Sequence, residues 1–222
     1  MKQTPIHDQF NADVLAVMPA NAVRVVEVGC SSGALAREYL RTNPQTDYVG
    51  IEVDPEYAAV ACTRCSKVIV ANIETMDDTV WTTLFPSDCW IFGDVLEHLY
   101  DPWAVLRRLR ESLAPGASVV ACIPNSQHWS IQARLNSGLL RYEESGLLDR
   151  THIRWFTKRT IFELFESSRF KLIDIRGRVF PEPQRDRALA GVRALAQAIG
   201  INAEAAVSDA TPVQWVVRAL PN

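Results

Sequence analysis

The chain of 222 residues lacks several features that would place it in a specialised class of protein. No apolar stretch approaches the roughly 20 residues that span a bilayer, and the polar N-terminus has no signal-peptide core. No run of Lys or Arg forms a basic tail or stripe, and the formal net charge is −3. These absences argue against a membrane protein and against a nucleic-acid-binding protein. We therefore expect a cytoplasmic protein with neither a nucleic-acid partner nor a membrane partner.

The sequence also lacks the cysteine pattern of a disulfide framework. Its five cysteines are odd in number and spread through apolar segments, which indicates buried, reduced thiols. The one C-x-x-C pair, Cys62 and Cys65, has no second pair to complete a zinc site and falls at the end of an expected helix. We interpret these cysteines as structural.

The overall composition is that of a folded globular protein. The hydrophobic fraction is 48% and the charged fraction is 22%. At roughly 150 residues per domain, the length accommodates one large α/β unit and would be cramped for two. We expect a single domain over residues 1–222.

Short apolar runs rich in Val and Ile alternate with amphipathic stretches, a pattern typical of βαβ units. The expected strands span residues 24–28, 48–53, 67–70, 89–93, 118–123, 170–175 and 213–219. The expected helices span residues 34–41, 55–62, 102–113, 158–168 and 187–199. The helix at 158–168 can be opened by Thr157 or by a capping box from Thr160 to Glu163. This order of elements predicts an α/β protein with a Rossmann-like, doubly wound sheet.

The first expected strand ends in a glycine-bearing turn that leads into a helix, which is the position of a nucleotide site. The turn reads E-x-G-x-x-x-G from Glu27 to Gly33. A dinucleotide fingerprint would need glycines at 29, 31 and 34, but Ser31 and Ala34 provide poorly for a pyrophosphate. Glu52 ends the second strand, where a carboxylate can accept both hydroxyls of a ribose. A site that binds a ribose but no pyrophosphate suits S-adenosylmethionine.

Four motifs together resemble the class I S-adenosylmethionine-dependent methyltransferases: EVGCSSG at 27–33, Glu52, ANIE at 71–74 and DVLEHL at 94–99. The resemblance extends over residues 23–175. The stretches IPN at 123–125 and GLLDRTHIRWFT at 146–157 are similar to a bacterial subgroup, the methyltransferase 23 or type 12 kind, linked to small-molecule and polysaccharide biosynthesis. The departure from the family is Ser31, which replaces its usual middle glycine. The resemblance implies a mostly parallel seven-stranded sheet in the order 3-2-1-4-5-7-6, with strand 7 antiparallel.

The resemblance also implies which residues bind the cofactor, S-adenosylmethionine. The implied cofactor-binding residues are Glu27, Gly29, Ser31, Gly33, Glu52, Asn72, Ile73 and Asp94. Glu27 and Gly29 would border the methionine moiety, and Glu52 would hold the ribose. Asn72 and Ile73 would contact the adenine, since an amide can both donate and accept at its edge. Asp94 would lie near the sulfonium, a cation that a nearby carboxylate favours.

Methyl transfer is an in-line displacement, so the protein mainly aligns the acceptor and excludes water. A hydroxyl acceptor is helped by a general base with a pKa near neutrality, and the available catalytic candidates are His98, His128 and His152. Each of these histidines could instead cap or pack. Asp94, Glu97 and His98 could hold a divalent cation, but cofactor-side and capping roles explain them without one. We therefore predict no metal ligand.

Residues 126–157 interrupt the α/β rhythm and are rich in Arg and aromatic side chains. We expect this segment to cap a small-molecule acceptor, for which a sugar or a ring-bearing metabolite would suit. The predicted function is methyl transfer to that acceptor, with oxygen favoured over nitrogen or carbon. One alternative is a non-catalytic S-adenosylmethionine-binding regulatory or scaffold subunit. Another, a nicotinamide-dependent oxidoreductase, lacks the full glycine fingerprint.

Overall fold

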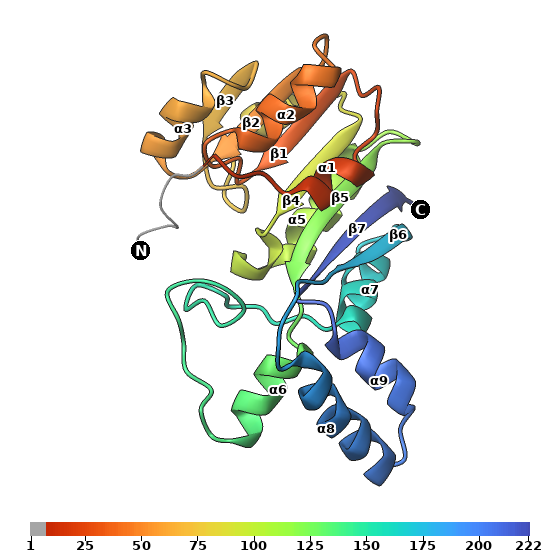
Figure 1. The fold of residues 1–222 in the computed structure, drawn as a ribbon. Helices are drawn as coiled ribbons and strands as arrows, with labels where there is room; N and C mark the ends of the chain where they lie inside the picture. The colour runs from red at the N-terminus through yellow and green to blue at the C-terminus, as the bar shows by residue number, and fades with distance from the viewer. Residues whose placement is uncertain (1–7) are drawn as a thin grey trace.

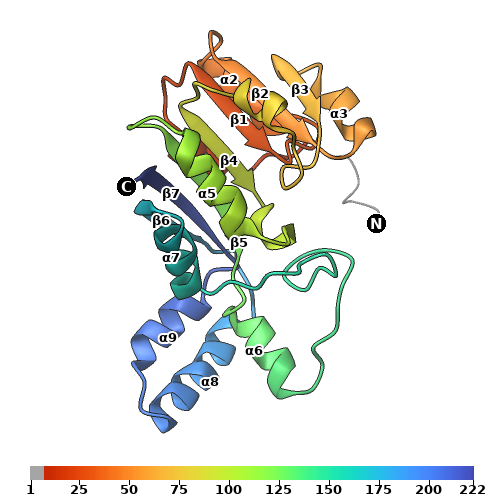
Figure 2. The same cartoon turned by 180° about the vertical axis from the view of Figure 1, so that it is seen from behind.

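The computed structural model describes residues 8–222 and is built on a single sheet with helices on both faces (Figures 1 and 2). The seven strands lie in the order β3-β2-β1-β4-β5-β7-β6, which confirms the predicted order. Their bounds are β1 (Arg24–Val28), β2 (Asp47–Glu52), β3 (Lys67–Val70), β4 (Cys89–Gly93), β5 (Ser118–Pro124), β6 (Phe170–Arg178) and β7 (Gln214–Pro221).

The first five strands pair in parallel, and β7 runs antiparallel to both of its neighbours. The prediction that the last strand is antiparallel is therefore confirmed. The largest error in a strand boundary is in β6, which was expected to end at Ile175. Its pairing with β7 continues to Arg178 opposite Gln214, through polar residues that carry no apolar signal.

The helices are α1 (Ala12–Val17), α2 (Ala34–Thr42), α3 (Pro55–Ala61), α4 (Asp78–Thr82), α5 (Pro102–Ser112), α6 (Trp129–Asn136), α7 (Lys158–Ser167), α8 (Arg185–Ala198) and α9 (Ala203–Ala210), with a 3-10 turn η1 (Leu96–His98). Asp54 and Asp101 cap α3 and α5, and the side chain of each accepts a hydrogen bond from a first-turn amide. Thr157 is the N-cap of α7 and forms a capping box with Thr160. Of the two expected starts, the structure therefore has the one at Thr157 and not the box from Thr160 to Glu163. Four helices were not expected from the sequence, and each has eight residues or fewer: α1, α4, α6 and α9.

Two hydrophobic layers lie on opposite faces of the sheet. In β4, Trp90 and Phe92 face one layer, which α5 and α7 cover, and Ile91 faces the other, which α1 and α2 cover (Figures 1 and 2). All three side chains are fully buried. Burial on both faces explains why the central strands are almost continuously apolar. Burying each side chain of this size contributes roughly 1.5–3 kcal/mol.

The cysteines behave largely as expected. All five are free thiols, and four of them are buried, whereas Cys62 is exposed. No helix within residues 8–222 is long and apolar enough to cross a membrane.

The topology collects the predicted motifs at one edge of the sheet. The parallel strands β1 to β5 all end at this edge, and β6 ends there too because it is antiparallel to β7. The first residue of β7, Gln214, begins at the same edge. In open α/β sheets, ligands bind in the crevice outside the carboxyl ends of the strands.

Candidate active site

The turn after β1 adopts the left-handed backbone that its glycines allow. Gly29 and Gly33 have φ of 67° and 74°, and Ser31 has φ of 48°. A Cβ at Gly29 would lie 2.7 Å from Val95 Cγ2, so glycine lets this turn approach the residues after β4. Ser31 takes a conformation that costs an L-residue roughly 1–2 kcal/mol.

Glu52 fixes this turn against the end of β2. Its side chain is 3% exposed, and Oε2 accepts a hydrogen bond from the Ser31 amide at 2.8 Å. Oε1 accepts from the amides of Val53 and Asp54 at 2.8 and 3.0 Å. The carboxylate predicted to hold the ribose therefore also organises the backbone around the site.

Glu27 points into the sheet face beneath α2. Its Oε2 accepts a hydrogen bond from the Tyr48 hydroxyl at 2.9 Å. Burial raises the pKa of Glu27 well above its usual range, and Cys65 and Glu52 add to the rise. The protonated form of Glu27 is therefore favoured, and contact with the methionine moiety stays a prediction.

Asn72 and Ile73 follow β3. The Asn72 Oδ1 accepts a hydrogen bond from the Glu74 amide at 2.8 Å, which forms a local turn, while Ile73 is buried. Beside them the structure exposes two apolar side chains that the sequence analysis did not select, Val53 at 54% and Val70 at 55%. Because Val70 pairs with Glu52, these valines flank the carboxylate.

Asp94 follows β4 and has φ of 56°. Its amide donates to the Cys122 carbonyl at 3.0 Å, and its Oδ1 accepts a hydrogen bond from Gln214 Nε2. Burial raises the pKa of Asp94 to about 6, against the opposing effect of Arg178. Asp94 is therefore mainly ionised at neutral pH.

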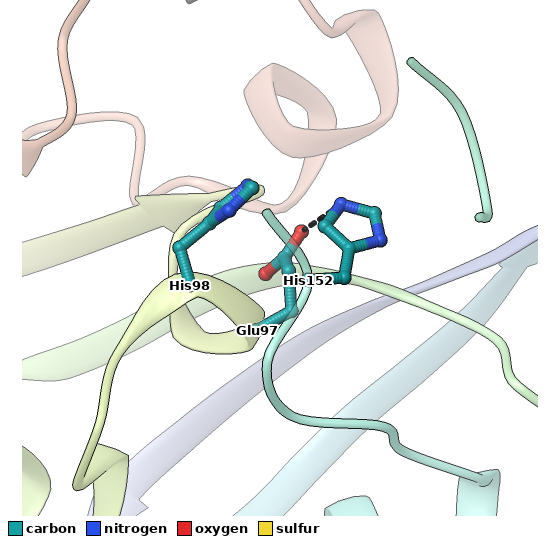
Figure 3. A group of neighbouring side chains, drawn as sticks. All are labelled: Glu97, His98 and His152. Carbon is teal, nitrogen blue, oxygen red and sulfur yellow. Dashed lines mark ion pairs between the residues drawn. The ribbon is translucent and has the colours of Figure 1, made fainter. Parts of the chain in front are cut away.

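Glu97, His98 and His152 form a cluster beyond Asp94 (Figure 3). Glu97 is 1% exposed, and neither carboxylate oxygen accepts a hydrogen bond from any residue within 8–222. His152 Nε2 lies 3.9 Å from Glu97 Oε1, and the two imidazole rings meet edge-on with centroids 4.8 Å apart. The structure thus brings together two of the three predicted catalytic histidines.

Backbone contacts dock the segment that carries His152 onto η1. The amides of Ile153 and Arg154 donate to the Glu97 carbonyl oxygen at 3.0 and 2.9 Å. The Nδ1 of His98 lies 3.1 Å from the Thr151 carbonyl oxygen, and the Nδ1 of His152 lies 3.3 Å from that of Leu147. Because a carbonyl only accepts, Nδ1 carries the proton in each neutral ring and Nε2 carries the lone pair.

Burial sets the charges in this cluster. It raises the pKa of Glu97 well above its usual range, and Asp94 adds to the rise. Burial also lowers the pKa of His152, with a further contribution from His98. Both shifts favour uncharged side chains at neutral pH, so His152 retains a lone pair there.

The same three side chains could hold a metal ion. One ligand atom from each lies within 4.8 Å of the others, and a carboxylate with two imidazoles suits a transition metal. The set considered from the sequence contained Asp94 in place of His152. The structure assigns Asp94 to a different set of contacts, with Gln214.

His128 lies apart from the other two histidines. It is fully buried at the start of α6, with Nδ1 2.8 Å from Ser130 Oγ and Nε2 3.4 Å from Glu182 Oε2. Trp129 Nε1 donates to the same Glu182 oxygen at 3.1 Å. These contacts describe a capping and packing histidine, and a catalytic role for His128 stays a prediction.

Sequence comparisons place the chain beside methyl-transferring enzymes. A family model described as "Methyltransferase domain" matches residues 6–175. A ubiquinone biosynthesis O-methyltransferase from Cereibacter sphaeroides (strain ATCC 17025) is 24% identical over 176 residues, covering 78% of this chain and 70% of that protein. The corresponding enzyme of strain ATCC 17029 is 23% identical over the same coverage.

Solved structures share the fold at low identity. A possible histamine N-methyltransferase from Thermotoga maritima has a TM-score of 0.61 at 15% identity, covering 94% of this chain and 86% of that one. The mitomycin 7-O-methyltransferase MmcR has a TM-score of 0.59 at 16% identity. The match covers 94% of this chain but only 52% of that protein. The magnesium protoporphyrin IX methyltransferase of Synechocystis PCC 6803, with bound SAH, has a TM-score of 0.59 at 10% identity, covering 95% and 80%.

Proposed function

This chain belongs to the methyltransferase domain family and uses S-adenosylmethionine as its cofactor, and we propose that it methylates an oxygen atom of a small-molecule acceptor. The observation that carries the proposal is the pair of imidazoles beside the buried carboxyl group of Glu97, whose oxygens accept no hydrogen bond from residues 8–222. Glu97 and His98 follow Asp94 by three and four residues, at the carboxyl edge that also carries the glycine turn. The curated relatives, which are named as O-methyltransferases, support oxygen as the acceptor atom.

The residues at the carboxyl edge of β1 to β4 fit the cofactor. Glu52 offers a carboxylate for the ribose hydroxyls, and the exposed Val53 and Val70 offer an apolar surface for the adenine ring. Asp94 offers a negative charge to the sulfonium. When bound, S-adenosylmethionine supplies a methyl group on a positively charged sulfur for in-line displacement.

His98 is the best-placed general base. Transfer of a methyl group to a hydroxyl releases a proton, which a positioned imidazole can accept. Nδ1 of His98 donates to the Thr151 carbonyl oxygen, so the lone pair on Nε2 of His98 is available. The His98 ring is half-buried, whereas Glu97 is fully buried. Glu97 and His152 lie against this ring. An imidazolium that forms here favours the ionised form of the neighbouring Glu97 carboxyl, and the resulting charge pair stabilises the imidazolium.

Residues 126–157 form the acceptor cap in this proposal. Chain positions 135–146 are exposed, while Leu148 is buried and anchors the following turn. Two aromatic side chains near the cluster are also exposed, Tyr100 at 76% and Trp155 at 39%. Exposed rings of this kind suit a ring-bearing or sugar acceptor through stacking and apolar contact.

The test combines cofactor binding with a panel of acceptors. Titration calorimetry should detect binding of S-adenosylmethionine, and phenol, catechol, sugar and amine acceptors should then be assayed for methyl transfer. We expect transfer to at least one hydroxyl acceptor.

A His98→Asn variant sharpens this test. Its amide can still donate to the Thr151 carbonyl but lacks the Nε2 base, and it should lower turnover by roughly 10²-fold. The exposed Arg159→Ala on α7 is the control and should leave turnover unchanged. Transfer to amines alone, or full turnover by His98→Asn, would refute the proposal.

A further inference from the structure

A chain of directional hydrogen bonds crosses the carboxyl edge of the sheet from α1 to the end of β4. Arg178, the last residue of β6, contacts Asp13 of α1 through Nε at 2.8 Å. Its Nη1 donates to Oε1 of Gln214, the first residue of β7, and Gln214 Nε2 donates to Asp94 Oδ1. β6 and β7 lie side by side (Figure 1). β6 ends and β7 begins at this edge, where Arg178 is paired with Gln214.

The chemistry of these groups fixes the direction of each bond. An arginine side chain can only donate, so the Gln214 oxygen must face Arg178. The Gln214 amide nitrogen must then face Asp94, which accepts. The Asp94 backbone is held as well, by its hydrogen bond to the Cys122 carbonyl. Asp94 is therefore fixed at both its main chain and its side chain.

Charged and titratable groups surround Asp94 from three elements. Arg178 on β6 and a hydrogen bond from the Cys122 thiol on β5 favour its ionised form, while Glu97 on η1 is a titratable neighbour that favours the neutral form of Asp94 when it ionises. Arg178 is itself mostly covered, with 19% of its side chain exposed. Because a partly buried charge pair is screened less than a surface pair, this arginine matters for the charge of Asp94.

We propose that Gln214 and Arg178 are positioning residues that hold the Asp94 carboxylate for the cationic cofactor. Both lie beyond the family match, which ends at residue 175, so the match does not assign them a role. They act through Asp94, and within the described residues neither makes a hydrogen bond to Glu97, His98 or His152. The inference rests on the proposed function, because it gives Asp94 its place near the sulfonium.

The test uses the difference between S-adenosylmethionine, which is a cation, and S-adenosylhomocysteine, which lacks the sulfonium. An ionised Asp94 favours the cation, so the ratio of the two dissociation constants reports its charge and position. Gln214→Leu and Arg178→Met should reduce the preference for the cation about 5- to 10-fold at pH 7. Arg178→Lys keeps the charge and should restore part of this preference.

Arg176→Met is the matched control, because Arg176 lies on the same strand and pairs with Asp174 at the surface. It should leave the ratio unchanged. Both binding constants should be measured by calorimetry from pH 5 to pH 8, on variants whose melting temperature shows that they fold. In Gln214→Leu and Arg178→Met, the loss of cation preference on acidification should begin at a higher pH than in the wild type.

The two proposals fail differently. A wild type that binds neither ligand, or methylates no hydroxyl acceptor, refutes the proposed function. A wild type that prefers the cation, with folded Gln214→Leu and Arg178→Met variants that keep the same ratio and pH dependence, refutes the positioning role. Equal losses in Arg178→Met, Arg178→Lys and Arg176→Met would also refute it, because the effect would then be a general disturbance of β6.

Discussion

Replacing Glu97 should stabilise the protein while it removes activity. Glu97 is 1% exposed, and both oxygens lack a hydrogen-bond donor among residues 8–222. A buried polar group without a partner costs about 1–3 kcal/mol. Methionine has a similar length and no such group, so Glu97→Met should raise the free energy of unfolding by about this amount.

The size of the effect depends on pH. Burial raises the pKa of Glu97 in the folded state well above its ordinary value of 4.5, so the folded state binds more protons than the unfolded state. Stability is therefore lost as the pH rises from about 4.5 towards the folded pKa, by up to about 1.4 kcal/mol per pH unit for one group. Glu97→Met lacks this loss, and its advantage should grow as the pH rises through this window.

Thermal unfolding and methyl-transfer assays test both halves of this prediction. For a protein of this size, 1 kcal/mol corresponds to about 2–4 °C in melting temperature. Turnover by Glu97→Met should fall roughly 10²-fold, because the variant lacks the carboxyl group that can ionise beside the imidazolium as it forms. Glu97→Gln is the control: it keeps a polar group and should gain less stability. A variant less stable than the wild type at pH 7 would show that Glu97 has a stabilising partner and would refute the reasoning.

Three further predictions concern the cofactor turn and the acceptor side. Glu52→Ala should weaken S-adenosylmethionine binding by roughly 2–4 kcal/mol, and should also destabilise the turn because three backbone amides lose their acceptor; unchanged affinity in calorimetry would contradict this role. His152→Ala should lower turnover roughly 10²-fold while cofactor affinity stays within about twofold; weak cofactor binding, or a lower melting temperature with normal turnover, would make it a structural residue. Ser31→Gly should raise the free energy of unfolding by roughly 0.5–1 kcal/mol, because it relieves a left-handed φ of 48° at the entropic cost of a glycine; a lower melting temperature would contradict that estimate.

Elements that are set by near neighbours in the chain were visible in the sequence, whereas contacts between distant residues were not. The apolar runs that form β1 to β5 and the Asp-Pro starts of α3 and α5 were visible in the chain, because burial on both faces and helix capping act within a few residues. The glycine turn was visible from its glycines, and the 94–99 motif from its resemblance to the methyltransferase family. The short helices α4 and α9 were missed because few residues carry their signal.

The arrangement of the candidate site depends on contacts between residues that are far apart in the chain. His98 contacts the carbonyl of Thr151, 53 positions away, only because the segment after α6 donates two backbone hydrogen bonds to the Glu97 carbonyl. No local pattern predicts that path, so the sequence offered three histidines without selecting among them. Burial of His128 beneath Glu182 and Trp129 became visible only in the folded chain.

The sequence by itself determined most of the strand and helix pattern, the glycine turn, and the positions of the carboxylates at the end of β2 and after β4, since these follow from interactions between near neighbours in the chain. The tertiary structure decided that His152 joins Glu97 where Asp94 had been considered as the third ligand. It also decided that Gln214, 120 positions from Asp94, donates to it. That contact requires β7 to insert antiparallel between β5 and β6 in one register, and register is set by the packing of the whole sheet.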